Sequence, residues 1–361
     1  MILSQDRYDD YIKFVNSHKN SGVMQGPEWA KVKEDNWRHE TVIALDDDGK
    51  ITGSMLILIR KLPFTGKTLL YSPRGPVMDF DDEKTLYQLL ESAKEVAKKY
   101  NAYCLKTDPV ILAGQQQYID MFKKAGFKFT PHLDLSHVTQ PRFNYMINLK
   151  GKTSGDIMAG FRRKTRYYIK FAEKNGVTVE IKDKSHLHEF YSVYRQTGDR
   201  NNFDVRSEKY LAKILDALGD KARLYICYYD GKPVAGAITS QYAGKTCHLY
   251  GGSDNEHRHL CPSYLMQWHM INWAIESGCE WYDFMGIVLT PEENEELYRV
   301  YEFKNKFNGE VVEYAGEFDY VYDAFAYNLF NMAKGFCKSL SILKKKLKRA
   351  KAGGEKTAQN E

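Results

Sequence analysis

The chain contains the same run of predicted elements twice, about half a chain apart. In the first copy, residues 43–53 are rich in β-forming side chains, turn at Asp48-Gly49, and are followed by a second such run at 67–71. In the second copy, residues 224–236 turn at Asp230-Gly231 and lead to residues 245–250. Asp-Gly between β-rich runs predicts a hairpin. The long offset excludes a solenoid and predicts two similar α/β units in tandem.

Each copy continues with a helical pattern and then a strand that ends near an aspartate. Apolar residues recur at helical spacing over 82–100, and the strand that follows ends before Asp108. Residues 262–277 predict a helix that begins with proline and stops at Gly278, and the next strand contains Asp283. This order of elements resembles acetyltransferase-like (GNAT) domains. We therefore expect an α/β (α+β) fold of two tandem GNAT-like domains without a coiled-coil arm.

These patterns also predict where the units begin and end. We expect the first GNAT-like domain over residues 1–150, with its last strand at 145–149, and the second over residues 151–317. A C-terminal amphipathic helix is predicted over 318–345, returning to the first domain, and a basic disordered tail over 346–361. Apolar residues recur every three or four positions along that helix and just beyond it: Phe325, Leu329, Met332, Phe336, Leu340, Leu343 and Leu347.

Composition favours an intracellular protein whose charge is unevenly distributed. The six cysteines include no Cys-x-x-Cys pair, and no apolar run is long enough to span a bilayer, so we expect a cytoplasmic chain with reduced thiols. From Ala324 to the end, nine lysines and arginines face two glutamates, although the whole chain has a net charge of only +5. This basic amphipathic end could lie on the inner face of an anionic membrane or be a solvated tail.

The loops that would bind coenzyme A in a GNAT domain are degraded in both copies. Family members hold the coenzyme A pyrophosphate in a Gln/Arg-x-x-Gly-x-Gly/Ala loop that opens the helix, where free backbone N–H groups meet phosphate. Here the corresponding loops read Ser-Pro-Arg-Gly-Pro at 72–76 and Ser-Asp-Asn-Glu-His-Arg-His at 253–259. Their sequences argue against acyl-CoA as the donor.

Six ordered segments resemble one family, the FemA/FemB/FemX group of peptidoglycan bridge-forming aminoacyltransferases. The segments are 25–33, 164–177, 197–203, 250–253, 282–286 and 303–309. The resemblance implies transfer of Gly, Ala or Ser from aminoacyl-tRNA to a stem-peptide amine, with no metal or organic cofactor. Only a short stretch separates Tyr210 from Leu224, so the helical arm of some members is missing. The armless type implies a UDP-linked muropeptide as acceptor, and a lipid-linked precursor remains the alternative.

The resemblance also assigns catalytic residues. It places Lys304, beside Phe303, next to the reacting ester, where a fixed positive charge would stabilise the tetrahedral oxyanion or the departing ribose oxygen. Asp108 could orient or deprotonate the incoming amine. The alternatives are a surface lysine in a basic loop and an ordinary aspartate in a turn before proline.

For the acceptor, the resemblance implies that Lys33 and Arg206 bind the diphosphate. Tyr210, Tyr103 and Tyr250 would bound the groove. A cation pair suits phosphate, and the arginine fork matches its geometry best. Any one of these tyrosines could instead be a core residue, since the chain has 26 of them.

A basic helix begins at residue 161 and carries the cations Arg162, Arg163, Lys164 and Arg166. These could contact the phosphates of a tRNA acceptor stem, or they could be a solvated helix face. Two other functions also stay open on this fold: an acyl-CoA-dependent N-acyltransferase, and a non-catalytic protein that binds tRNA or membrane.

Overall fold

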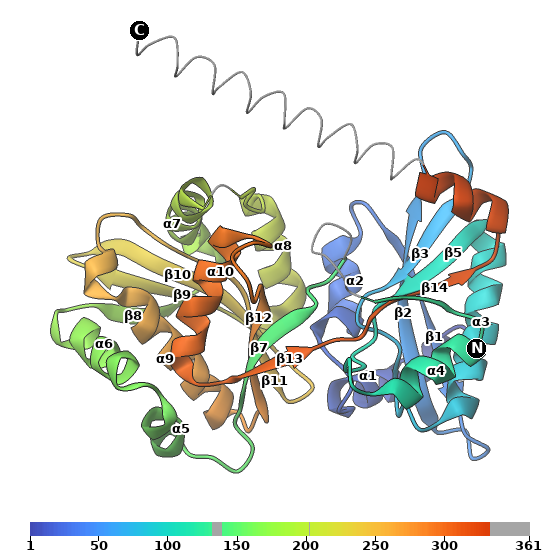
Figure 1. The fold of residues 1–361 in the computed structure, drawn as a ribbon, viewed down its shortest axis with the longest axis horizontal. Helices are drawn as coiled ribbons and strands as arrows, with labels where there is room; N and C mark the ends of the chain where they lie inside the picture. Colours follow the sequence, from blue (N-terminus) through green and yellow to red (C-terminus); the bar gives the residue numbers. More distant parts are fainter. Residues whose placement is uncertain (132–138, 202, 333–361) are drawn as a thin grey trace, which may run out of the picture.

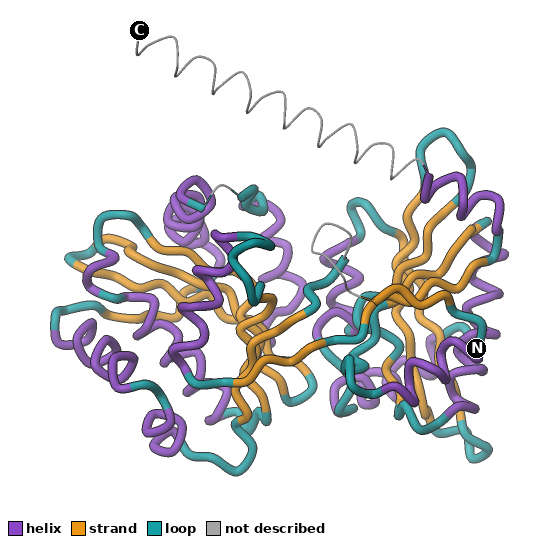
Figure 2. Tube along the Cα trace, viewed as in Figure 1, coloured by secondary structure: helices purple, strands orange, loops and turns teal. Residues whose placement is uncertain are grey.

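The structure is a computed structural model that describes residues 1–131, 139–201 and 203–332. Two β-sheets lie next to each other, each with helices on both faces (Figure 1). Figure 2 shows the chain crossing between the two sheets in the middle of the molecule. Among the described residues, no helix is both long and apolar enough to cross a bilayer.

The first sheet has the strand order β1-β2-β3-β5-β14-β6, with β4 paired to β2. Its strands are mostly antiparallel, and only β3 and β5 run parallel. The bounds are β1 Arg38–Leu45, β2 Ile51–Lys61, β3 Thr68–Ser72, β4 Val77–Met78, β5 Ala102–Thr107, β6 Lys128–Pro131 and β14 Gly316–Val321.

The second sheet has the order β13-β7-β12-β11-β10-β9-β8, with only β11 and β12 parallel. The bounds are β7 Phe143–Asn148, β8 Thr178–Lys182, β9 Ala222–Tyr229, β10 Lys232–Tyr242, β11 Lys245–Ser253, β12 Trp281–Ile287 and β13 Glu310–Glu313.

The helices cover the sheets from both sides. The bounds are α1 Tyr8–Ser17, α2 Pro27–Lys33, α3 Glu83–Tyr100, α4 Gln116–Lys124, α5 Ser154–Gly160, α6 Arg163–Lys174, α7 Leu187–Arg200, α8 Glu208–Leu218, α9 Pro262–Glu276 and α10 Glu295–Lys304. Helix α3 begins where the Asp82 side chain accepts from the Thr85 N–H, and it ends at Asn101 in the left-handed conformation.

The predicted repeat is confirmed. Strands β1, β2 and β3, helix α3 and strand β5 follow one another in the first unit, and β9, β10, β11, α9 and β12 repeat that order in the second. Both predicted hairpins turn at a glycine with positive φ, 78° at Gly49 and 71° at Gly231, which glycine adopts without a steric penalty. The α8 helix passes through a short turn directly into β9, so the described chain has no arm at this position.

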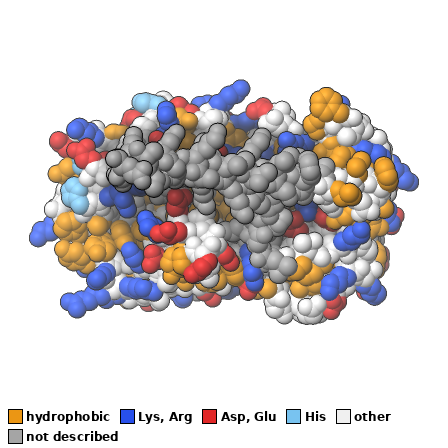
Figure 3. Space-filling view, turned by 45° about the horizontal axis from the view of Figure 1, so that its top comes forward, with side chains coloured by type: hydrophobic (Ala, Val, Ile, Leu, Met, Phe, Trp, Pro, Cys, Tyr) orange, Lys and Arg blue, Asp and Glu red, His pale blue; other side chains and the backbone are white. Residues whose placement is uncertain are grey.

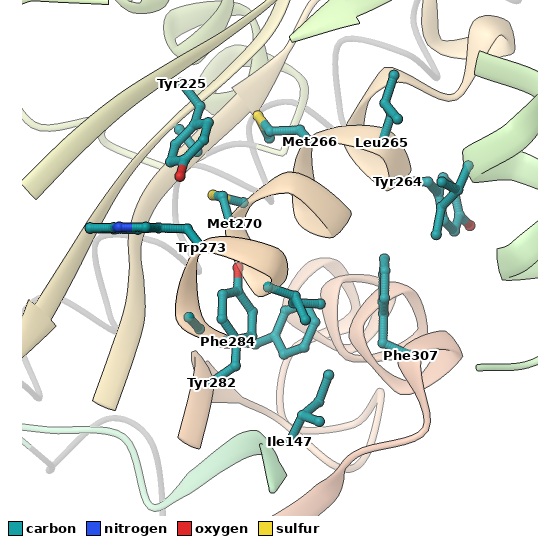
Figure 4. Packing of buried hydrophobic residues seen from close by; sticks show 14 of the residues in the cluster. Ile147, Tyr225, Tyr264, Leu265, Met266, Met270, Trp273, Tyr282, Phe284 and Phe307 are labelled. Carbon is teal, nitrogen blue, oxygen red and sulfur yellow. The ribbon is translucent and has the colours of Figure 1, made fainter. Parts of the chain in front are cut away.

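One strand lies in a different sheet from the one predicted. We expected the strand near residue 145 to close the first domain, but β7 pairs with β12 and β13 of the second sheet. Its Ile147 packs in the second core (Figure 4). In exchange, β14 inserts between β5 and β6 of the first sheet. The chain therefore crosses between the sheets twice, and the Tyr314 N–H donates to the Arg142 carbonyl where the two crossings meet.

A shared apolar cluster joins the two units. Side chains of α1 and α2, including Tyr11 and Trp29, pack in the same cluster as Phe190 of α7 and Leu211 of α8. Helix α2 packs directly on α8. Residues at this junction are consequently held by contacts from both halves of the chain.

The C-terminal helical segment (residues 324–332) packs on the first unit, as expected for the start of the returning helix. Ala326 is buried against Tyr103 and Cys104. The predicted continuation to residue 345 and the basic tail lie outside the described residues.

Candidate active site

An interface cluster of cations and aromatic rings (Trp29, Lys33, Arg206, Tyr210 and Tyr250) forms where α2 meets α8. The Lys33 Nζ donates to the Tyr210 hydroxyl at 2.6 Å and lies 4.7 Å from the centre of the Trp29 ring. The Arg206 guanidinium lies 5.6 Å from the Tyr210 ring. The hydroxyl of Tyr250 on β11 lies close enough to Tyr210 and Arg206 to interact with both side chains. The structure thus brings together four of the five residues assigned to the acceptor.

The interface cluster carries positive charge without a carboxylate partner. Burial, together with the charge of Arg206, lowers the pKa of Lys33 to about 8. Among the described residues, no aspartate or glutamate forms an ion pair with either cation. Lys33 is half-buried and Arg206 is exposed beside it, so an anion that binds here would restore the solvation that Lys33 has lost.

Tyr103 does not lie in this cluster. Its ring centre is 4.8 Å from that of Phe330, and its carbonyl accepts from the Tyr322 N–H at 2.9 Å. Burial raises its pKa to about 12. The structure therefore places Tyr103 beneath the C-terminal helical segment, a contact between residues more than 200 positions apart.

Lys304 ends α10 and is buried, with 7% of its surface exposed. Its Nζ donates to the Gly286 carbonyl at 2.8 Å and to the Met285 carbonyl at 3.3 Å. Burial lowers its pKa to about 8, against the opposing charge of Asp283. An ammonium has three N–H donors, so one stays available to a ligand.

A β-bulge in β12 creates the two carbonyl acceptors of Lys304. The pairing with β7 slips between Asp283 and Gly286, and Met285 takes a φ of 66°. The Asp283 carboxylate accepts from the Met285 N–H at 2.6 Å and from the Asn144 side chain at 2.8 Å. Bulges re-aim the groups around them. Here the carboxylate of Asp283 fixes the strand conformation that presents both carbonyls to Lys304.

Lys304 lines a pocket of about 530 Å³ that opens where β11 and β12 diverge. The two parallel strands pair only at three positions, beginning at Lys245 and Trp281, and then separate. Beyond that point Gly251 and Gly252 form one wall, with Phe284 on the other strand. The apolar part of the lining belongs to the core shown in Figure 4. We call this cavity the lysine pocket.

The lysine pocket is rich in cations. Arg200, Arg258, Arg299 and Lys306 line it together with Lys304, against the glutamates 296 and 302. Arg200 donates to the Ser253 carbonyl, and burial together with the charge of Arg258 lowers its pKa. This lining favours a ligand with several negative charges.

The β11 strand serves both sites because it too contains a bulge. His248 pairs opposite Thr239 and Tyr250 opposite Ile238, so Leu249 is the extra residue. His248 lines the lysine pocket and contacts Gln267, whereas Tyr250 joins the interface cluster. Burial lowers the pKa of His248 to about 3, so its ring is neutral at physiological pH.

Asp108 is fully buried at the end of β5. One of its oxygens accepts from the Tyr71 hydroxyl at 2.8 Å and the other from the Arg74 N–H at 2.6 Å. Burial raises its pKa to about 6. Arg74 in turn lies 4.0 Å from the Tyr314 ring at the crossing between the sheets. The structure thus joins Asp108 to the loop at 72–76, with no hydrogen bond to Lys304.

The basic helix lies beside the lysine pocket. Arg162, Arg163 and Lys164 are exposed, whereas Arg166 donates to the carbonyls of Ala159 and Phe161 and ties α5 to α6. The buried Thr165 hydroxyl donates to the Lys306 carbonyl at 2.7 Å. Helix α6 therefore contacts a residue that lines the lysine pocket, whereas Arg162, Arg163 and Lys164 are not among the lining residues themselves.

Sequence reasoning missed several residues of these sites. Arg74 and Tyr314 come together only because the chain crosses twice between the sheets, which no local pattern records. Arg200 lies in one of the six family-like segments and Arg258 in the loop at 253–259, and only the folded chain brings both to the same pocket.

The two GNAT-like units, with a buried lysine in the cleft between the parallel strands β11 and β12, define an acyltransferase-type fold. The FemAB family model matches residues 5–243 and 228–335, and the chain belongs to the FemAB family. The resemblance inferred from the six segments is thereby confirmed.

Individual relatives agree with this membership. The "Lipid II:glycine glycyltransferase" of Staphylococcus aureus (strain USA300) is 29% identical over 410 aligned positions, covering 93% of this chain and 97% of the relative. Since the alignment is longer than this chain, the relative contains segments that are missing here. The crystal structure of FemX superposes with a TM-score of 0.83 at 27% identity, covering 91% of this chain and 98% of that one.

A tandem GNAT protein from the clavulanic acid biosynthesis pathway confirms the fold class. It superposes with a TM-score of 0.52 at 9% identity, covering 88% of this chain and 97% of its own. At this identity the likeness concerns the fold alone.

Proposed function

We propose that this chain transfers an amino acid from aminoacyl-tRNA to the stem-peptide amine of a peptidoglycan precursor, forming the interpeptide bridge. The observation that carries the proposal is Lys304, a buried ammonium fixed by two backbone carbonyls in a cation-lined pocket. Glycine is the first donor to test, because the S. aureus relative is named a glycyltransferase. Alanine and serine are the alternatives.

In the proposed reaction the acceptor amine attacks the ester carbonyl of the aminoacyl-tRNA. The carbonyl oxygen becomes an oxyanion, which accepts from the free N–H of Lys304. The bond to the ribose oxygen then breaks and the amide remains on the acceptor. The attacking amine gives up one proton as the amide forms and the ribose oxygen takes one up, so the proton released by the amine restores the group that supplied the proton to the ribose oxygen. With a pKa of about 8, Lys304 is protonated at neutral pH, so it can stabilise charge and supply that proton. Phe303 packs beside it in the pocket wall.

We assign the interface cluster to the diphosphate of the acceptor. Lys33 and Arg206 supply the charge, and Tyr210 and Tyr250 supply hydroxyl groups. A diphosphate is common to UDP-linked and lipid-linked precursors, so the cluster fits both. Asp108 would act by holding the loop at 72–76, since both of its oxygens already accept hydrogen bonds.

We assign the exposed cations Arg162, Arg163 and Lys164 to the phosphates of the tRNA. Their support is the direct contact between α6 and the lysine pocket through Thr165. Binding through phosphates would weaken steeply as salt rises. Contact with an anionic membrane is a further part of the proposal, and exposed apolar and basic side chains of the first unit support it.

One assay tests the donor and the acceptor together. The protein is incubated with radiolabelled glycyl-, alanyl- or seryl-tRNA and a UDP-linked muropeptide, and parallel reactions contain acetyl-CoA or tRNA treated with ribonuclease. We expect labelled muropeptide only with intact aminoacyl-tRNA. Product from acetyl-CoA would favour the N-acyltransferase alternative. Absence of product on UDP-linked and lipid-linked acceptors alike would favour a non-catalytic binding protein.

A further inference from the structure

Four large apolar side chains are exposed at one end of the first unit. Phe64 is fully exposed, and Phe325, Met332 and Leu329 expose 79%, 74% and 51% of their surface. Phe64 stands in the loop between β2 and β3, and the other three stand on the C-terminal helical segment. Soluble proteins rarely expose clustered apolar groups of this size without a binding role.

The loop and the helical segment form one surface. Leu62 and Leu69, on either side of the loop tip, pack in a cluster with Tyr327 and Phe330 of the segment. Lys67 forms an ion pair with Asp323 at 2.9 Å. Figure 1 shows the loop beside the segment at the same end of the molecule. In the space-filling view, hydrophobic side chains gather there, with cations at the edge of the group (Figure 3).

Packing among the described residues does not account for the outer face of this segment. Ala326, Tyr327 and Phe330 already face the sheet, so Phe325 and Leu329 form a second apolar stripe that faces outward. A helix that is apolar on both sides is normally buried on both. Phe64 has a φ of 62°, a backbone conformation that favours glycine. Its side chain is also exposed, so neither the backbone conformation nor packing explains why an aromatic residue stands at the tip of this loop.

Cations surround the apolar side chains. Arg60 and Lys61 are exposed at the base of the loop, and the Lys128 Nζ lies 4.7 Å from the Tyr327 ring. Within the described part of the chain, none of these three cations forms an ion pair with a carboxylate. Aromatic and aliphatic side chains with a basic rim are the composition of surfaces that insert into the interface of an anionic bilayer.

We propose that Phe64, Phe325, Leu329 and Met332 form a membrane-docking surface that inserts into anionic bilayers, with Arg60, Lys61 and Lys128 contacting lipid headgroups. The surface belongs to the folded first unit, so it adds to any contribution of the basic tail. Its use in reaching a lipid-linked acceptor rests on the proposed function, whereas bilayer binding does not.

Vesicle binding by the full chain tests the surface. Phe64→Ser/Leu329→Ser and Ile181→Ser are compared with the wild type, because Ile181 is 55% exposed on β8 of the other unit and serves as a matched control. We expect the double variant to bind phosphatidylglycerol-containing vesicles at least about tenfold more weakly, while Ile181→Ser binds like the wild type. Vesicles of phosphatidylcholine alone should bind all three weakly.

Three outcomes would overturn the proposal: equal vesicle binding by the double variant and the wild type, failure of the wild type to bind anionic vesicles, or equal loss in the Ile181→Ser control.

Light scattering, which measures the oligomeric state, provides a fourth outcome that would overturn the proposal. If the wild type dimerises, and the double variant is monomeric with unchanged vesicle binding, the surface joins two copies of the chain instead. Circular dichroism and thermal unfolding verify that the double variant is folded. No acceptor or tRNA is present, so the outcome does not depend on the proposed transferase activity.

Discussion

The Nζ atom of Lys304 is buried, carries a positive charge and is fixed in position by hydrogen bonds to two backbone carbonyls. Replacing it with alanine should lower turnover about 100-fold or more with little change in the Michaelis constant for the acceptor, because an oxyanion partner acts mainly in the transition state. Lys232→Ala is the control, since Lys232 is an exposed lysine of the same unit that does not line the pocket. Steady-state kinetics with labelled aminoacyl-tRNA measure both. Near wild-type turnover in Lys304→Ala would remove this lysine from the mechanism.

Asp283 acts on Lys304 through the bulge and through its charge. Asn can still accept from the Met285 N–H but removes the negative charge, so the pKa of Lys304 should fall further below about 8. We expect Asp283→Asn to shift the alkaline loss of turnover toward lower pH and to reduce turnover about tenfold, on the scale of one pKa unit. Turnover measured from pH 6 to 9.5 tests this. If turnover falls at the same alkaline pH in Asp283→Asn as in the wild type, Asp283 has only a structural role.

At the scale of elements, helix α2 and the loop just before helix α8 contribute the two cations of the interface cluster, Lys33 and Arg206. Lys33→Ala and Arg206→Ala should each raise the Michaelis constant for the diphosphate-bearing acceptor about tenfold or more, with a smaller effect on turnover, because a charge-assisted hydrogen bond to phosphate is lost. Lys31→Ala, on an exposed position of the same helix, is the control. If all three variants have the wild-type constant, the phosphate assignment is wrong.

Local patterns predicted the elements well and their partners poorly. The Asp-Gly turns and the spacing within α3 depend on neighbouring residues, so the repeat could be read from the chain. The pairing of β7 with the second sheet and of β14 with the first depends on contacts far apart in sequence. The burial of Tyr103 beneath residues 324–332 has the same origin. Lys304 and the interface cluster were found because a family resemblance carries information about distant contacts.

At the scale of the whole molecule, the interface cluster joins the units, so its ligand should stabilise both. UDP at millimolar concentration is expected to raise the unfolding temperature of the wild type by a few degrees, because a ligand that binds only the folded state adds RT ln(1 + [L]/Kd) to its stability. Differential scanning fluorimetry measures this. A shift of equal size in Arg206→Ala would place the UDP elsewhere.

The cluster also predicts a conflict between stability and binding. The pKa of Lys33 is lowered to about 8, so below that pH the folded state holds a charge that the unfolded chain solvates better. Lys33→Met should therefore raise the free energy of unfolding at pH 7 by about 1–3 kcal/mol, less whatever the lost contacts with Tyr210 and Trp29 contributed.

The sign of this effect fixes its pH dependence. Between pH 8 and 10.5 the unfolded wild type retains the Lys33 proton that the folded state has released, so wild-type stability rises with pH and the advantage of Lys33→Met disappears. Urea unfolding at pH 7 and pH 10 tests this, with Lys31→Met as the exposed control. Saturating UDP should reverse the order at pH 7, because only the wild type gains from the anion. If Lys33→Met is less stable than the wild type at pH 7 without UDP, the charge of Lys33 does not destabilise the folded state and this prediction is wrong.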